Sequence, residues 1–203
     1  MKTKFLPIAL ALVLGFGVTS CTIEINDGID GTNSGVGTTE GVLSGSGILR
    51  GNITNNLLIK KGNYTMEGVV RVSNGAKITI EPGANFTVQT NSTSALVILN
   101  DGIIDAQGTA SEPIVFTTAS KTPGDWGGIT IYGKAPIKAL NGNTTAQSED
   151  GNNLSYGGSN ANDNSGTMKF VRVEYAGKKI GDGTSETNTF TFYSVGAGTV
   201  LEN

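Results

Sequence analysis

The chain has 203 residues and carries 14 basic and 17 acidic side chains, for a formal net charge of -3, with no histidine. This balance, without a cluster of lysine and arginine, excludes the basic surface that a nucleic-acid-binding protein requires. The lack of histidine excludes Ser-His-Asp and Cys-His catalytic sites, and also histidine-ligated zinc. Charged residues form only 15% of the chain and glycine reaches 30 copies, a composition that favours short strands and turns over helices.

Residues 1–20 are predicted to be a lipoprotein signal peptide. Lys2 and Lys4 precede an apolar run from Phe5 to Val18, which is shorter than the roughly 20 residues of a membrane-spanning helix. The next residues, Val-Thr-Ser-Cys, resemble a bacterial lipobox, whose cysteine receives a diacylglycerol. Cys21 is the single cysteine, so no disulfide can form, and the alternative is an ordinary signal peptide with an incidental cysteine. A lipobox predicts export through the Sec pathway and a lipid anchor at the outer membrane or cell surface.

Residues 21–47 are predicted to be the lipidated cysteine followed by a flexible tether. Glycine recurs there at short, irregular intervals and no aromatic residue occurs, so the segment cannot bury enough apolar area to offset the entropy of ordering it. The early acidic residues Glu24 and Asp27 weakly resemble the acidic export signals of Bacteroidota surface lipoproteins. The alternative is a tether that is acidic without being such a signal.

Residues 48–203 are predicted to be all-β. Short segments of β-branched or aromatic residues end at Gly, Pro-Gly or Asn-Gly. Alternation along them assigns faces, so that Ile78 and Ile80 oppose Thr79. The expected strands lie within 68–72, 77–83, 85–89, 95–102, 103–108, 113–118, 127–133, 169–177, 189–194 and 199–203.

A repeating block favours one architecture, a single-stranded right-handed parallel β-helix that is incomplete at its C-terminal end. No stretch shows helical periodicity, which excludes a βαβ sheet, and a sandwich or barrel would need hairpins between strands of similar length. Equivalent apolar positions recur about every 25 to 32 residues, within the range of solenoids. They align as Val70 with Val97 and Ile129, Ile78 with Ile104, and Phe86 with Phe116.

Three segments connect or leave these coils. Pro82-Gly83 is predicted to be a corner, because proline fixes φ on the way in and glycine takes a conformation that other residues avoid. Residues 134–167 form a long polar insertion, and residues 178–188 form a shorter one. Loops on a rigid scaffold are where binding surfaces tend to be built.

More specific stretches are IEPGANF, QGTASEPIVFTTA, PGDWGGITIYGKAPI, GGSNANDNSGTMKFVRVEYAG and VGAGTVLEN. Together they are similar to a family of right-handed β-helix surface proteins of Bacteroidota, many known only as lipoproteins or type IX secretion substrates. The resemblance spans about Gly51 to Asn203 and implies the fold and a surface location. Members of that family continue beyond VGAGTVLEN, which implies that the chain is an N-terminal fragment. The alternative is a short form whose last strand, Thr199 to Glu202, pairs with a partner.

The acidic residues are scattered and are predicted to be turn formers rather than the acid/base pair of a polysaccharide hydrolase. They are Asp101, Asp105, Glu112, Asp125, Glu149, Asp150 and Asp163. Stacking of Asp101 on Asp125 is the alternative. Arg172 and Glu174 are predicted to form a surface ion pair. The loop from Asn160 to Gly166 superficially resembles a Ca²⁺ site but lacks the distal glutamate, so it predicts an Asn-rich turn without metal; no cofactor is predicted.

Three aromatic residues, Trp126, Tyr132 and Tyr156, are the candidate ligand-binding side chains. Exposed rings beside Asn and Asp can stack on a sugar while polar groups meet its hydroxyls. The alternative is that Trp126 covers a corner of the core and the insertion packs over the tyrosines. The leading hypothesis is a non-enzymatic, surface-tethered lipoprotein whose lateral loops bind glycan or a partner protein. The alternatives are a polysaccharide lyase or hydrolase of the same fold, and a structural spacer from a longer secreted protein.

Overall fold

The computed structural model describes residues 41–90, 93–139, 142–150, 153–180 and 185–203. The predicted signal peptide, Cys21 and most of the predicted tether therefore lie outside the described residues. Within the described ranges, no helix is long and apolar enough to span a membrane.

The chain winds into stacked coils, and each coil contributes strands to three faces. Strands β1 (Gly41–Ile53) and β2 (Leu57–Val72) each run along all three faces, with register shifts in the pairing between them. The later coils are divided into shorter strands: β3 (Lys77–Ile80), β4 (Asn85–Val88), β5 (Ala95–Ile98), β6 (Ile103–Gln107), β7 (Ile114–Thr118), β8 (Ile129–Tyr132), β11 (Gly166–Lys169), β12 (Val171–Val173), β15 (Phe190–Tyr193) and β16 (Val200–Glu202). Two antiparallel hairpins leave the coils: β9 (Thr145–Gln147) with β10 (Ser155–Gly157), and β13 (Lys179–Ile180) with β14 (Ser185–Glu186).

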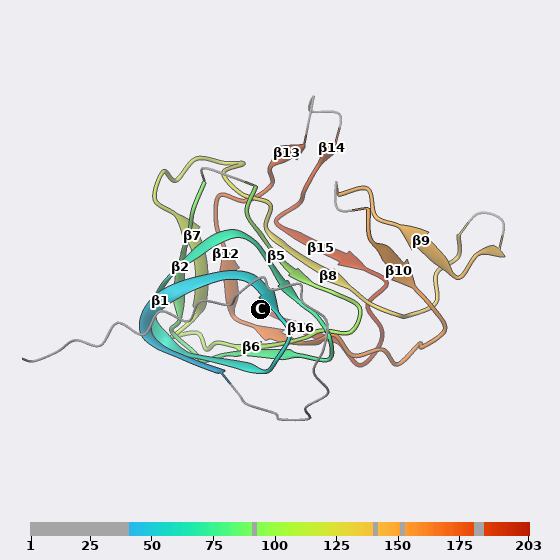
Figure 1. The fold of residues 1–203 in the computed structure, drawn as a ribbon, viewed down its shortest axis with the longest axis horizontal. Coiled ribbons are helices and arrows are strands. Elements are labelled where there is room, and N and C mark those ends of the chain that lie inside the picture. The colour runs from blue at the N-terminus through green and yellow to red at the C-terminus, as the bar shows by residue number, and fades with distance from the viewer. Residues whose placement is uncertain (1–40, 91–92, 140–141, 151–152, 181–184) are drawn as a thin grey trace, which may run out of the picture.

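Every pairing between coils is parallel, as a β-helix requires. Face 1 contains β3, β6, β11 and β16 on the first part of β2. Face 2 contains β4, β7 and β12 on the middle of β2. Face 3 contains β5, β8 and β15 on the last part of β2. Figure 1 looks along the stack, so the three faces form a triangle and the β9–β10 hairpin lies outside face 3. The predicted parallel β-helix is confirmed.

Aromatic rings stack inside face 2 and hold successive coils in register. Tyr64, Phe86 and Phe116 occupy paired positions on β2, β4 and β7. The Phe86 and Phe116 ring centroids lie 4.4 Å apart with an interplanar angle of 6°, and Trp126 lies 6.1 Å beyond Phe116. All four side chains are buried. A single coil could not bury these rings, so the stacking of neighbours creates the core.

The predicted corner at Pro82-Gly83 is present between β3 and β4. Gly83 has φ of 78°, a left-handed conformation that a residue with a Cβ adopts at a cost. A Cβ there would also lie 3.1 Å from the Lys61 side chain. The Gly83 amide donates to the Glu112 carbonyl oxygen at 3.1 Å, which ties the corner to the next coil.

Strand β1 already covers residues 41–47, which were predicted to be tether, and does not begin at Ile48. Residues 41–47 look like tether because glycine and serine dominate them, yet Leu43 points into the core with 2% of its surface exposed. Glycines at positive φ, including Gly45 at 75°, let this strand bend without a run of apolar residues. Parallel pairing with β2 holds residues 41–47 in a strand, although their composition alone would not.

One predicted alignment is wrong by one residue. Val70 pairs with Leu96, and Leu96 pairs with Ile129, so Leu96 and not Val97 is the inward residue. A shift of one residue moves a side chain to the opposite face of a strand. Val97 nevertheless is fully buried, because the outer surface of face 3 is covered.

Replacing Phe116 with alanine should lower the free energy of unfolding by about 3–5 kcal/mol, because it removes the ring stacked between Phe86 and Trp126 and leaves a cavity. Urea unfolding followed by the fluorescence of Trp126, the only tryptophan, measures this. The matched control is Phe192→Ala, at a ring that is 38% exposed and should matter less. Equal losses in the two variants would contradict the central role of the face 2 stack.

Candidate functional site

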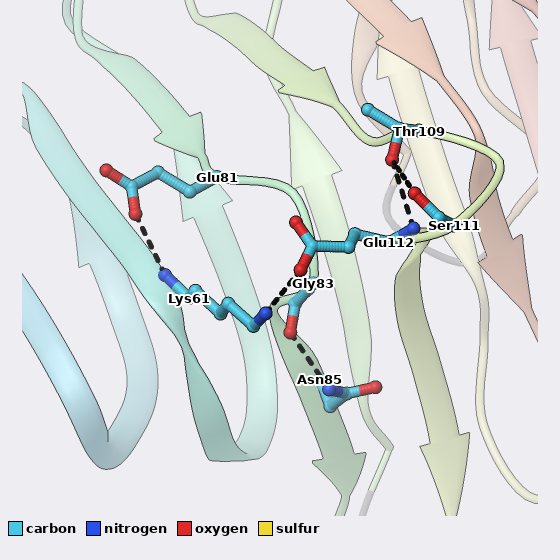
Figure 2. A network of polar contacts seen from close by, with 7 residues as sticks. All are labelled: Lys61, Glu81, Gly83, Asn85, Thr109, Ser111 and Glu112. Carbon is cyan, nitrogen blue, oxygen red and sulfur yellow. Dashed lines mark hydrogen bonds and ion pairs between the residues drawn. The ribbon is translucent and has the colours of Figure 1, made fainter.

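The corner between face 1 and face 2 carries a polar network that joins three coils (Figure 2). The Lys61 amide donates to Glu81 Oε2 at 3.0 Å. The Lys61 ammonium forms an ion pair with Glu112 Oε1 from the coil beyond. The Asn85 side-chain amide donates to the Gly83 carbonyl oxygen at 3.0 Å. This network brings two carboxylates and one lysine to the same corner.

Glu112 is further held by its own turn. Its amide donates to Thr109 Oγ1 at 3.0 Å, and that hydroxyl lies 3.3 Å from Ser111 Oγ (Figure 2). Sequence reasoning predicted Glu112 as a turn residue but missed its partners Lys61 and Glu81. The signal that could have found them is the recurrence of Glu-Pro, at Glu81 and again at Glu112, just before a strand.

A glycoside hydrolase uses a pair of carboxylates, and at this corner each carboxylate is held by a contact within the fold. The Lys61 side chain is 62% exposed and that of Glu112 is 45% exposed. An ion pair this exposed stabilises by at most about 1 kcal/mol, and water is not excluded as it is in a closed active site. The network is therefore better described as a structural link between neighbouring coils than as an acid/base site.

The predicted alternative of stacking between Asp101 and Asp125 is not realised, because the two residues lie at different corners. Asp101 follows β5 and its Oδ2 accepts the Asn74 amide at 2.8 Å. Asp125 lies between β7 and β8. Each carboxylate thus serves its own turn, in agreement with the prediction of turn-forming acids.

Asp125 accepts three hydrogen bonds at its turn. Its Oδ2 accepts the hydroxyl of Ser120, the hydroxyl of Thr118 at 2.7 Å and the amide of Thr122 at 3.0 Å. These donors, the Ser120 hydroxyl first, hold the pKa of Asp125 below its usual value because they favour the charged form. The lowered pKa favours the ionised form of Asp125, which stabilises the turn as a hydrogen-bond acceptor.

Two further predictions are confirmed, the surface ion pair and the Asn-rich turn. Arg172 Nε and Glu174 Oε1 lie 2.8 Å apart as a surface ion pair. In the Asn-rich loop, Asn164 Oδ1 accepts the Gly166 amide at 2.8 Å, and Asn160 Oδ1 accepts the next-but-one amide at 3.2 Å. Within the described part of the chain, no group of three or more acidic, histidine or cysteine side chains is placed to hold a metal ion.

The predicted platform of exposed aromatic rings is wrong for Trp126 and Tyr132. Trp126 is fully buried, packs on Phe116 and donates its indole N–H to the Glu174 carbonyl oxygen at 2.9 Å. Tyr132 points away from the coil interior, as predicted, but only 1% of its surface is exposed. Tyr156 is half-buried. The rings of Trp126 and Tyr132 therefore offer no open face for a sugar, and the alternative prediction describes these two correctly.

Tyr132 is buried because the 134–167 insertion packs onto face 3. The Tyr132 hydroxyl donates to Asp150 Oδ2 and lies 3.1 Å from Ser148 Oγ, which donates to Asp150 Oδ1 at 2.8 Å. The Tyr132 and Tyr193 rings stack with centroids 5.0 Å apart, and Tyr156 packs on Tyr193 at 4.7 Å. A small second core results, which also contains Val69, Ala95, Val97, Leu99 and Leu154.

The pKa of Tyr193 agrees with the burial of its hydroxyl in this cluster. Burial raises the pKa of the Tyr193 hydroxyl above its ordinary value, and the nearby charge of Asp150 adds to the shift. Both causes disfavour a phenolate. The Tyr193 hydroxyl is therefore a neutral packing and hydrogen-bonding group at physiological pH.

An apolar pocket of about 280 Å³ lies at the last coil. Phe192 and Leu201 are 38% and 42% exposed there. The lining is of the type found inside the coils and includes Met168, Val171 and Phe190. It offers little polar chemistry.

Comparison with known proteins gives one family. The model of the pectate-lyase like beta helix domain matches residues 51–203. No curated protein and no solved structure matches the chain significantly. The match agrees with the stacked parallel coils and covers the strands from the end of β1 onward.

Replacing Tyr132 with phenylalanine should lower the free energy of unfolding by roughly 1–3 kcal/mol, because the buried Asp150 carboxylate loses a hydroxyl donor. Chemical denaturation measures the change, and hydrogen exchange of the insertion amides shows whether it is local. Tyr156→Phe is the control, since that half-buried hydroxyl makes no contact with Asp150 that the structure records. A neutral Tyr132→Phe variant would show that the insertion does not depend on this contact.

Proposed function

Because the chain belongs to the family of pectate-lyase-like β-helix domains, we propose that it is a non-enzymatic, lipid-anchored protein of the cell surface that binds glycan. The observation that carries the proposal is the use of its carboxylates. Asp101, Asp125, Asp150 and Glu112 each accept hydrogen bonds or pair with a cation within the fold. A general acid or base must instead exchange its proton with a bound substrate.

The polysaccharide part of the proposal is supported by the family description and by the shape of the molecule. Flat parallel faces present side chains at regular intervals along the stack, which suits an extended polymer more than a small compact ligand. Binding without cleavage uses such faces and needs no acid/base pair.

The anchor is supported by the sequence at Cys21, which follows a short apolar run and ends a lipobox-like tetrapeptide. The glycine-rich segment after it has the composition of a linker. A lipid-anchored β-helix held away from the membrane by such a linker has its lateral faces free to meet surface polymers.

Cleavage of polysaccharide is the second candidate, and the family description favours it. A lyase requires a base near the sugar ring together with a cation that neutralises a uronate. The corner of Lys61, Glu81 and Glu112 is the one place described above where a base and two carboxylates meet. Product release separates this candidate from simple binding.

The purified full chain, incubated with a panel of neutral and acidic polysaccharides, should retain at least one polymer and release no reducing or unsaturated ends. Affinity electrophoresis measures retention, and absorbance of unsaturated products with a reducing-sugar assay measures cleavage. Release that disappears in Lys61→Ala would establish the enzymatic candidate instead. Failure to retain any polymer of the panel would contradict glycan binding.

Cys21→Ser should abolish incorporation of a radiolabelled fatty acid and move the protein from the membrane fraction to the soluble fraction, because the thiol that carries the lipid is lost. The control is Ser20→Ala, which leaves the cysteine in place. Fatty-acid labelling that persists in Cys21→Ser would overturn the lipid anchor without touching the argument on glycan binding.

A further inference from the structure

The geometry points to the outer surface of face 2 as a binding site for a neutral, extended polysaccharide that runs along the stack of coils. This inference rests on the proposed glycan-binding function and adds the surface, the residues and the ligand class. The surface is named here the face 2 array and consists of Asn63, Asn85, Thr65, Thr87 and Thr117.

The array follows directly from the register of the coils. Thr65 pairs with Thr87, and Thr87 pairs with Thr117. Their neighbours Tyr64, Phe86 and Phe116 point inward and are buried, so by alternation the threonines point outward. Successive strands lie about 4.8 Å apart, which makes the three hydroxyls a row roughly 10 Å long.

A second row runs beside the first. Asn63 pairs with Asn85, two residues before the threonines, and both asparagines are exposed. The two rows together offer amide and hydroxyl groups at matching heights on adjacent coils. Such groups both donate to and accept from the hydroxyls of a sugar.

Most of these groups are not used by the fold. Among the described residues, the side chains of Asn63, Thr65 and Thr87 have no recorded hydrogen-bond partner. The Asn85 side chain donates to the Gly83 carbonyl oxygen, which leaves its own amide oxygen available as an acceptor. Thr117, at the end of the row, donates to Glu174. The array therefore holds donors and acceptors that only water or a ligand can satisfy.

The other two faces are occupied differently. On face 1, Gln107 donates to Asp105 at 2.7 Å and Lys169 pairs with Glu202 at 3.0 Å. On face 3, the insertion buries the outward residue Val97 completely. Face 2 is not covered by the insertion at Thr65 and Thr87. Its paired outward residues, Thr117, Arg172 and Glu174, lie toward the β7–β12 end.

Charges around the array cancel in pairs. Arg50 lies 3.8 Å from Glu67, Lys61 contacts Glu112, and Arg172 lies 2.8 Å from Glu174. The array itself carries no charge. A polyuronate would meet no net positive field here, so the matching ligand is a neutral polymer.

The array has no aromatic ring, so each sugar unit gains little from stacking. Hydrogen bonds to neutral groups are individually weak because they replace bonds to water. Binding strength must then come from several contacts made at once by one chain. The ligand is accordingly a polymer, and its affinity should rise with length until it spans the row of threonines.

The test uses the full chain and affinity electrophoresis through gels that contain a neutral β-glucan, a neutral xylan or polygalacturonate. The double variant Thr65→Lys/Thr87→Lys should bind the neutral polymer roughly tenfold more weakly, as expected for losing two hydrogen-bonded contacts. The matched control is Thr79→Lys/Thr167→Lys, which adds the same charge to outward positions of face 1 and should bind like wild type. Thermal unfolding verifies that both variants fold; Asn63→Ala/Asn85→Ala replaces the first variant if it does not.

The outcomes are distinct. If wild type binds a neutral polymer and only the face 2 variant weakens it, the inference holds. If binding is lost equally in the face 1 control, or is unchanged in the face 2 variant, the array is not the site although glycan binding stands. Stronger retention by polygalacturonate than by both neutral polymers overturns the ligand class. If wild type binds none of the polymers, the proposed glycan-binding function fails together with the inference.

Discussion

Parallel pairing between successive coils is the interaction on which the rest of the molecule depends. No coil can bury its own inward side chains, so the core exists only where one coil lies on the next. The rings of Phe86 and Phe116 stack with centroids 4.4 Å apart and nearly parallel planes, which shows how closely the positions of successive coils correspond. Because side chains alternate along a strand, the register that stacks the inward residues also stacks the outward ones. The row from Thr65 to Thr117 is therefore a consequence of the row from Tyr64 to Phe116.

The corners between faces have a different physical task, which explains where the acidic residues are. A chain that turns sharply leaves backbone amides without strand partners, and these need acceptors. Asp101 accepts the Asn74 amide, Asp125 accepts the Thr122 amide and Glu81 accepts the Lys61 amide. Asp101 and Asp125 serve separate corners in this way, whereas Glu81 and Glu112 share one corner with Lys61. The positions of these acidic residues are thus tied to the corners that the fold must stabilise.

Much of the fold could be predicted from the sequence because its strands alternate cleanly and end at turn residues. Ile78 with Ile104 and Phe86 with Phe116 were aligned correctly. Val97 was not, since four apolar residues in a row, Ala95 to Ile98, give no alternation to read. The strand from Gly41 was missed because its glycines suggest a linker, while its order comes from pairing with β2. Local pattern identifies the elements, and pairing between coils decides the ambiguous ones.

The candidate site was harder to predict, because a single strand does not reveal what covers it. Alternation placed Tyr132 on the outer side of β8 correctly, but the burial of this ring depends on Asp150 and Ser148 from the insertion. An outward aromatic side chain is therefore insufficient evidence for a sugar platform when a long loop follows it. The same contact has a second effect, since an insertion fixed on face 3 is kept away from face 2. The burial that removes Tyr132 from the list of ligand-binding residues leaves the threonine and asparagine rows open to solvent, and it moves the search for a ligand from the loop to the sheet.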